Sequence, residues 1–299
     1  MSQNSKRSLP KVTEVNSVKE IVGKTEVQPL KKANQSGSSQ QFLQLFKMFS
    51  IDGGLVPEDK KLVIEDRAQQ RVRNTQVIKQ KNIENITKQT ITYCASKDIS
   101  QRVDYDWLSR YIELAEGISN TTMQDLWAKI LAAELMRPGS YSYKAIKLLR
   151  EMSIFDAKLL AKACSLSVKD SRYNNVRIIS GAYQKTSLLN FLNRDRQVNI
   201  DLSNVGLNHT DILSLAESHL IYAQESESNS LSKGEGLVFT YSGSNLSLVS
   251  KKSGVSLQFY KFTPVGAELA KLITGKRNEQ YLSAIKESLS VHFHIAIKS

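Results

Sequence analysis

Residues 123–139, MQDLWAKILAAELMRPG, decide the fold of this chain. Apolar side chains recur along them at helical spacing, at Met123, Leu126, Trp127, Ile130, Leu131 and Leu135. This spacing predicts an amphipathic helix with one buried face. Thr121 and Gln124 have the spacing of a capping box at its start, and Pro138 with Gly139 stops it.

The same kind of pattern extends to both sides of this helix. A preceding helix is predicted from an apolar face at Trp107, Leu108, Tyr111, Ile112, Ala115 and Ile118. A third helix opens at Ser140 or Ser142, and a fourth opens at Ser153 with Asp156 as its capping box. Four short amphipathic helices with brief connections predict a compact helical bundle over residues 104–166.

Three segments of this bundle carry a resemblance: WLSRY at 107–111, MQDLWAKILAAE at 123–134 and RPGSYS at 137–142. Together with the looser QKNIENI at 80–86, they resemble a bacterial family catalogued only as a domain of unknown function. The resemblance implies a motif for interaction or structure, and no activity. Its candidate residues are Trp107, Arg110, Trp127, Glu134 and Arg137. A weaker similarity in helix order, to the alpha family of abortive-infection proteins, implies a role in phage defence.

Glu134 is the one polar residue whose position on the apolar stripe needs a reason. Its carboxylate is expected to be partly desolvated, so that a cation has to meet it. Arg137 at i+3 and Arg110 on the preceding helix are the candidate partners. The alternative is that the carboxylate belongs to a binding site for a cationic ligand.

Three further segments are predicted before the bundle. Residues 1–41 are polar, basic and without period, which is typical of a disordered tail. Phe42, Leu45, Phe46 and Phe49 predict a short amphipathic helix within residues 42–56, docked on its own core or, alternatively, lying on a membrane surface. Residues 57–103 predict one long polar helix that opens at Pro57, and it fits a partner protein or a second copy of the chain.

Beyond residue 166 the pattern changes to alternating strands mixed with helices, so residues 167–299 predict an α+β domain. A helix from Asn208 ending at LIY (220–222), a β-hairpin, and FTPVGAEL at 262–269 resemble the last helix, wing and exit of winged-helix proteins, especially multiple-antibiotic-resistance regulators. In such proteins this helix enters the major groove. Here it carries no Lys or Arg, and only Lys251 and Lys252, in the second hairpin turn, are candidates for contact with phosphates.

The composition restricts the class of protein. The chain has 299 residues with 41 Lys+Arg and 29 Asp+Glu, a formal net charge of +12. This excess is spread over the tail, the long helix and the last domain, which predicts weak and non-specific nucleic-acid binding at most. Cys94 and Cys164 form no C-x-x-C, so two reduced thiols are expected. With neither a signal peptide nor a membrane-spanning run, the chain is expected to be soluble and cytoplasmic.

A catalytic or cofactor signature is missing from the sequence. Gly234-x-Gly236 lacks the helix and third glycine of a dinucleotide loop, and no nucleophile elbow is found. His292 and His294 alternate on a terminal strand without a third ligand, which favours a solvent-facing pair over a metal site. We therefore expect a mainly helical α+β protein, with no enzyme activity, cofactor or metal, that acts through protein contacts and self-association. The rival hypothesis is a winged-helix DNA-binding regulator.

Overall fold

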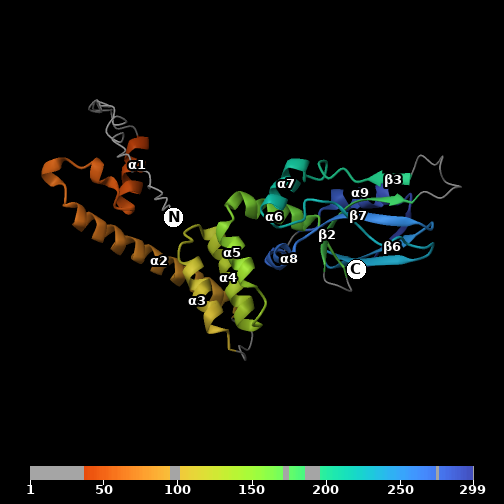
Figure 1. Cartoon of the computed structure of the whole chain (residues 1–299), viewed down its shortest axis with the longest axis horizontal. Coiled ribbons are helices and arrows are strands. Elements are labelled where there is room, and N and C mark those ends of the chain that lie inside the picture. The colour runs from red at the N-terminus through yellow and green to blue at the C-terminus, as the bar shows by residue number, and fades with distance from the viewer. Residues whose placement is uncertain (1–36, 95–101, 171–174, 186–195, 274–275, 299) are drawn as a thin grey trace, which may run out of the picture. The chain divides into compact units, whose positions relative to one another are not determined.

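The computed structural model describes residues 37–94, 102–170, 175–185, 196–273 and 276–298, with only the backbone of 37–40 (Figure 1). In these ranges the chain forms helices and an antiparallel sheet, which is an α+β fold. It divides into two compact units, the first ending at Val72 and the second starting at Arg73. The predicted tail lies outside the described residues up to position 36.

The first unit contains helix α1 (Gly37–Met48), two 3-10 turns, η1 (Asp52–Gly54) and η2 (Glu58–Lys60), and the start of α2 (Ile64–Cys94). Helix α1 begins five residues before the predicted position 42. The predicted opening of the long helix at Pro57 is wrong, because η2 ends at Lys60 and the next residue, Lys61, is extended, with ψ 120°. Glu65 and Asp66 then occupy the first turn of α2, where the helix dipole favours acids.

The second unit begins within α2 and continues through the predicted bundle. Its four helices are α3 (Tyr105–Ala115), α4 (Thr121–Met136), α5 (Tyr143–Glu151) and α6 (Ile154–Ser165). Helix α2 is largely exposed and buries one stripe, at Asn82, Ile86 and Thr90, four residues apart. The Asn82 amide donates to the Glu116 carbonyl at 2.9 Å, so this stripe is fixed to the end of α3.

The bundle has an aromatic centre. Trp127 and Tyr111 are fully buried, and the Tyr111 hydroxyl donates to the Trp127 carbonyl at 2.7 Å. Trp107 stacks on Tyr111 with ring centroids 5.3 Å apart. Burying large aromatic side chains contributes most of the hydrophobic stabilisation of a core of this size.

The helix caps follow the sequence closely, with one correction. The capping box of Ser153 with Asp156 is confirmed, and so is the start at Asn208 of α7 (His209–Glu217), where Asn208 and Asp211 also form a capping box. The predicted Thr121 box is wrong, because Asn120 caps α4 by accepting from the Thr122 and Met123 amides at 3.0 and 3.1 Å. Gln124 is buried and donates instead to the Ile118 carbonyl at 2.8 Å.

One antiparallel sheet follows the bundle, in the strand order β4-β7-β2-β1-β5-β6-β8, with β3 paired to β2. The strands are β1 (Val168–Asp170), β2 (Val176–Gln184), β3 (Gln197–Asn199), β4 (Ser226–Glu227), β5 (Gly236–Tyr241), β6 (Ser244–Ser250), β7 (Val255–Lys261) and β8 (Phe293–Lys298). The turn of the predicted β-hairpin lies at Ser242 and Gly243, which join β5 to β6 and have positive φ, 47° and 89°. Two positive φ angles fit a type I′ turn, which suits the twist of a hairpin.

The second predicted hairpin does not form. Strand β6 pairs with β5 and β8, whereas β7 pairs with β2 and β4, so these two consecutive strands are separated in the sheet. Their partners come from distant parts of the chain, which strand patterns do not reveal. The structure thus gives a sheet of eight described strands in place of the small sheet and wing of the predicted winged helix, which is not confirmed.

Helices α7, α8 (Pro264–Ala270) and α9 (Glu279–Leu289) complete the second unit. Helix α7 ends at Glu217, five residues before the predicted Tyr222, because His219 takes a positive φ of 55° and the chain then pairs Ile221 with Phe262. Helix α8 packs closely on this segment: a Cβ on Gly266 would lie 1.9 Å from the Leu220 carbonyl oxygen. Helix α9 packs against β2, where the buried Tyr281 hydroxyl donates to the Ile179 carbonyl at 2.8 Å.

Candidate anion-binding cleft

The loop at residues 137–142 connects α4 to α5 and is held by a buried carboxylate. Glu134 is 2% exposed and accepts from the Gly139 amide at 2.6 Å and from the Tyr141 amide at 3.2 Å. Hydrogen bonds from backbone amides compensate a carboxylate for the water that burial removes. Glu134 therefore fixes the shape of this loop.

A second carboxylate, from a helix far along the chain, binds the same loop. Glu268, on α8, accepts from the Ser142 amide at 2.7 Å, at the N-terminus of α5. Helices α5 and α8 lie in contact (Figure 1). Burial, with the charges of Glu268 and Glu134 nearby, raises the pKa of Tyr141 to about 12. The loop thus joins the bundle to the strand-rich part of the unit.

Arg137, at the start of this loop, lines a cleft of about 490 Å³ between the loop, β1, β7 and α8. Three lysines from separate elements line the same cleft: Lys169 on β1, Lys261 on β7 and Lys271 after α8. Within the described part of the chain, none of these four cations forms an ion pair. With Glu268 as the one carboxylate of the lining, the cleft carries a formal net charge of +3.

Polar and aromatic groups complete the lining of this basic cleft. The lining also includes Asn175, Thr263 and Tyr222, and Tyr222 is 47% exposed. The Tyr222 amide donates to the Lys261 carbonyl at 2.9 Å, which holds the backbone that carries the ring. Cations gathered in a concave surface with low-dielectric walls focus their field on an approaching anion.

The structure separates the five residues of the predicted motif by role. Trp107 and Trp127 belong to the core, where the Trp107 indole donates to the Tyr141 carbonyl at 2.9 Å. Arg110 lies over the ring of Tyr143, 5.1 Å from its centroid. The predicted pairing of Glu134 with Arg110 or Arg137 is wrong, because backbone amides occupy both carboxylate oxygens. Arg137 alone among the five lines the basic cleft.

The two lysines predicted to contact phosphates lie elsewhere. The Lys251 ammonium donates to the Ser290 carbonyl at the C-terminal end of α9, where the helix dipole favours a cation. Lys252 is partly buried, and its carbonyl accepts from the Ser250 hydroxyl at 2.6 Å. Neither lines the basic cleft.

The predicted solvent-facing histidine pair is wrong for one of its members. His292 is fully buried and precedes β8, whereas His294 is exposed on that strand. The two side chains therefore face different environments. In the ranges that the structure covers, no group of three His, Cys, Asp or Glu side chains is placed to hold a metal.

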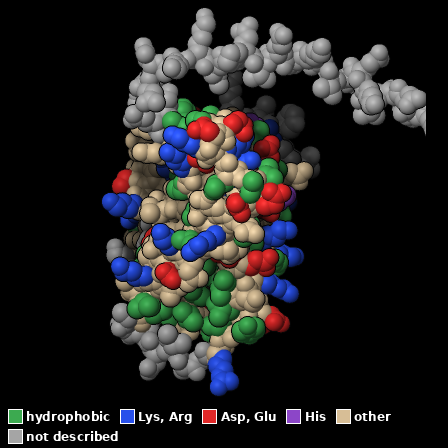
Figure 2. All heavy atoms as spheres, turned by 90° about the vertical axis from the view of Figure 1, so that its left-hand side faces the viewer, with side chains coloured by type: hydrophobic (Ala, Val, Ile, Leu, Met, Phe, Trp, Pro, Cys, Tyr) green, Lys and Arg blue, Asp and Glu red, His purple; other side chains and the backbone are tan. Residues whose placement is uncertain are grey.

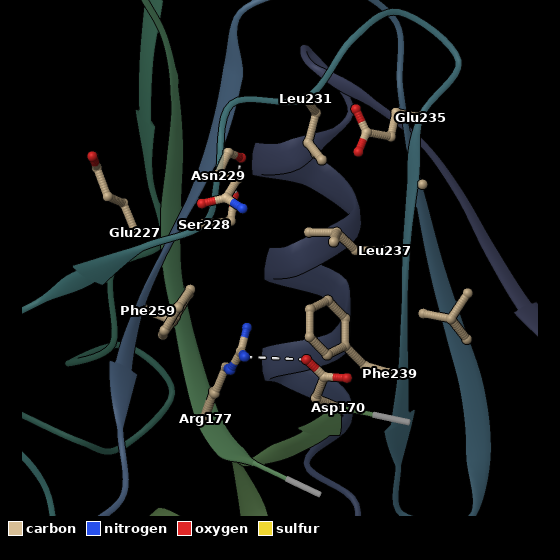
Figure 3. A pocket seen from close by; sticks show the side chains of 12 residues that line it. Asp170, Arg177, Glu227, Ser228, Asn229, Leu231, Glu235, Leu237, Phe239 and Phe259 are labelled. Carbon is tan, nitrogen blue, oxygen red and sulfur yellow. Dashed lines mark hydrogen bonds and ion pairs between the residues drawn. The ribbon is translucent and has the colours of Figure 1, made fainter. Parts of the chain in front are cut away.

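A second cleft, of about 620 Å³, opens between β2, β7 and β5 (Figure 3). Arg177 projects into it, paired with Asp170 at 3.1 Å and placed over the ring of Phe259, 4.5 Å from its centroid. Burial lowers the pKa of the Arg177 guanidinium. Glu227 binds the Tyr183 hydroxyl and Glu235 accepts from the Ser232 amide, so the acids of this cleft already serve the fold.

The first unit exposes apolar side chains, contrary to the prediction of a helix docked on its own core. Apolar side chains reach the surface among charged ones in Figure 2. The large apolar side chains of residues 42–64 that are more than a third exposed are Phe42, Leu45, Phe46, Met48, Phe49, Ile51, Leu55, Leu62, Val63 and Ile64. None of the helices described is both long and apolar enough to cross a membrane.

Of the basic cleft, sequence analysis identified only Arg137. Lys169, Lys261, Lys271 and Tyr222 come from four separate segments, and no spacing in the sequence relates them. The one available signal was an excess of Lys and Arg over acids in residues 167–299. Such an excess does not show which of these cations lie together in the fold.

Comparison with known proteins gives one match. The model of a family described as a protein of unknown function (DUF2806) matches residues 66–286, which include most of the second unit and every residue of the basic cleft. No curated protein and no solved structure matches the chain.

Proposed function

Because the chain belongs to the DUF2806 family of proteins of unknown function, its activity has to be inferred from its own surface, and we propose that it is a non-enzymatic interaction module that holds a polyanionic partner in the basic cleft. The observation that carries this proposal is the set of four cations from four elements around one cleft, none of them in an ion pair within the described residues. Bringing such charges together costs electrostatic free energy, which a bound anion offsets.

The chemistry of the cleft supports binding over catalysis. Its one carboxylate, Glu268, already accepts a hydrogen bond from the Ser142 amide, and the Thr263 hydroxyl donates to the His219 carbonyl at 2.7 Å. These groups hold the fold, so the lining supplies cations and no free general base. We therefore specify the partner predicted from the sequence as a negatively charged one.

A duplex-reading winged helix has less support. Helix α7 carries no Lys or Arg, and its Asp211 pairs with Lys162 of α6 at 2.8 Å. The acids of this helix would repel the phosphates on either side of a groove. The predicted role in phage defence rests on helix order alone and stays a prediction.

Binding to immobilised heparin, a sulfated polyanion, tests the proposal. Arg137→Ala combined with Lys169→Ala removes two exposed cations of the cleft and is expected to elute at clearly lower salt than the unchanged protein. Lys286→Ala combined with Lys298→Ala removes the same charge from exposed positions outside the cleft and serves as the matched control.

Two results decide the matter. A shift confined to the cleft variant, with the same melting temperature for both variants, supports a specific anion site. Equal shifts for the two variants show that only net charge matters, and they reject the cleft as the functional site.

A further inference from the structure

We infer that the partner held in the basic cleft is a single-stranded nucleic acid, with its phosphates on the four cations and one base stacked on Tyr222. This inference rests on the proposed function and names the class of its polyanion. Its starting point is the combination of cations and an exposed aromatic ring in one cleft. Proteins that bind single strands without sequence preference combine these two features.

Tyr222 is placed as a stacking surface and not as a core residue. The residue is 47% exposed, while its neighbour Ile221 is buried and forms an isolated antiparallel bridge with Phe262. The Tyr222 amide is bound to the Lys261 carbonyl at 2.9 Å, so the ring and the Lys261 side chain start from one fixed piece of backbone. An aromatic face held beside a cation matches a base joined to its phosphate.

The cations come from different elements around the cleft. Arg137 approaches from the loop after α4, Lys169 from β1 and Lys271 from the end of α8. A polymer with regularly repeated charges meets several cations at once and releases counterions at each contact.

A single strand fits this cleft better than a duplex does. Bases in a duplex are stacked on both faces, so they offer no free face to Tyr222, whereas an unpaired base does. A cleft of about 490 Å³ is also small beside a double helix, whose grooves admit protein elements rather than the reverse. An acidic peptide would satisfy the cations but would leave the exposed ring of Tyr222 without a role.

Fluorescence anisotropy with three labelled probes tests the inference on the full chain. The probes are a mixed-sequence single strand of about 12 nucleotides, the corresponding duplex, and a polyglutamate peptide with the same number of charges as the single strand. We expect the single strand to bind most tightly. Four phosphate contacts predict that the logarithm of its affinity falls with the logarithm of salt concentration with a slope of roughly −2.8.

The variants separate charge from stacking. Lys169→Ala is expected to make the salt slope shallower by about 0.7, because one phosphate contact is lost. Tyr222→Leu is expected to weaken binding about tenfold without changing the slope, since it removes a stacking face and no charge. Tyr222→Phe keeps the ring and is expected to bind within about twofold of the unchanged protein, and Lys286→Ala is the control outside the cleft.

The possible results distinguish this inference from the function on which it rests. If polyglutamate binds as tightly as the single strand, and Tyr222→Leu has no effect while Lys169→Ala does, the nucleic-acid partner is rejected and the polyanion site stands. Tighter binding of the duplex also rejects the inference. If no probe binds, both proposals fail.

Discussion

Glu134 shows how a single carboxylate replaces an ion pair. Both of its oxygens are used by the Gly139 and Tyr141 amides, and the side chain is almost completely buried. Removing it leaves two amides of the loop without this partner, one in the exposed Gly139 and one in the buried Tyr141. Because an unsatisfied buried donor costs about 1 to 3 kcal/mol, we expect Glu134→Ala to lower the free energy of unfolding by about that amount, measured by urea denaturation.

Two further variants identify the partner of Glu134. Glu134→Gln keeps one acceptor oxygen and is expected to lose about half as much stability. Arg137→Ala is expected to be nearly neutral, and a double-mutant cycle of the two residues is expected to give a coupling energy close to zero. A coupling above about 1 kcal/mol would restore the ion pair predicted from the sequence.

The N-cap of helix α4 is Asn120 and not its neighbour Thr121. Asn120 accepts from two amides of the first turn, whereas the side chain of Thr121, the residue predicted as the cap, makes no such contact. Asn120→Ala is expected to cost about 1 kcal/mol of stability, and Thr121→Ala less than about 0.5 kcal/mol. Thermal melts followed by circular dichroism measure both, and the reverse ranking would contradict the assignment of the cap.

Local elements were predictable from the sequence because their signals are local. The capping box at Ser153 and the start of α7 at Asn208 follow from hydroxyl, amide and acid side chains three residues apart. The opening of α2 was wrong because Pro57 and two acids fit a 3-10 turn as well as an α-helix. Such a signal indicates where a helical segment starts, but it does not distinguish an α-helix from a 3-10 turn.

The order of the strands could not be predicted, and neither could the basic cleft. Strand β2 pairs with β7, so that Arg177 lies opposite Lys261, and alternation of apolar residues does not specify such distant partners. The cleft depends on the same pairing, because β1, which carries Lys169, and β7, which carries Lys261, both flank β2. The position of the cleft is therefore determined by the order of the strands in the sheet.

The exposed apolar side chains of α2 favour self-association of the chain. Val77 and Ile91 are 45% and 63% exposed and lie two heptads apart, on one face of α2. We expect a dimer whose mass by light scattering falls towards that of the monomer on dilution, and Val77→Glu is expected to weaken it. Thr92→Glu, a change at another position of the same helix, is the control. A mass of one chain at every concentration would contradict this prediction.

Buried tyrosines make the stability of the second unit depend on alkaline pH. Burial raises the pKa of Tyr281 well above its usual value of 10.0, and burial likewise raises that of Tyr111. Their hydroxyls ionise in the unfolded chain near pH 10 but not in the folded one, so their contribution is complete below pH 10 and decreases above it. Each such tyrosine adds about 1.4 kcal/mol of lost stability per pH unit.

Unfolding experiments from pH 7 to 11 measure this loss. The unchanged protein is expected to keep its stability up to about pH 9 and to lose it increasingly above about pH 10. Tyr281→Phe is expected to make that decrease shallower by the equivalent of one proton. Tyr105→Phe removes a hydroxyl from a residue that is 80% exposed and is expected to leave the slope unchanged. Equal slopes for all three proteins would show that Tyr281 ionises freely in the folded state.

The bond between the Ser142 amide and Glu268 has a consequence for synthesis of the chain. The two residues are 126 positions apart, and at about 5 to 20 residues per second a ribosome needs roughly 6 to 25 s to cover that distance. The four helices up to Ser165 and then Lys169 are completed early in this interval, while the loop at 137–142 still lacks one of its two carboxylates. Lys261 is added shortly before Glu268, and Lys271 shortly after it. The cleft is therefore assembled only after Lys271 has been added, and a ligand that needs all four cations selects chains synthesised beyond this residue over shorter nascent ones.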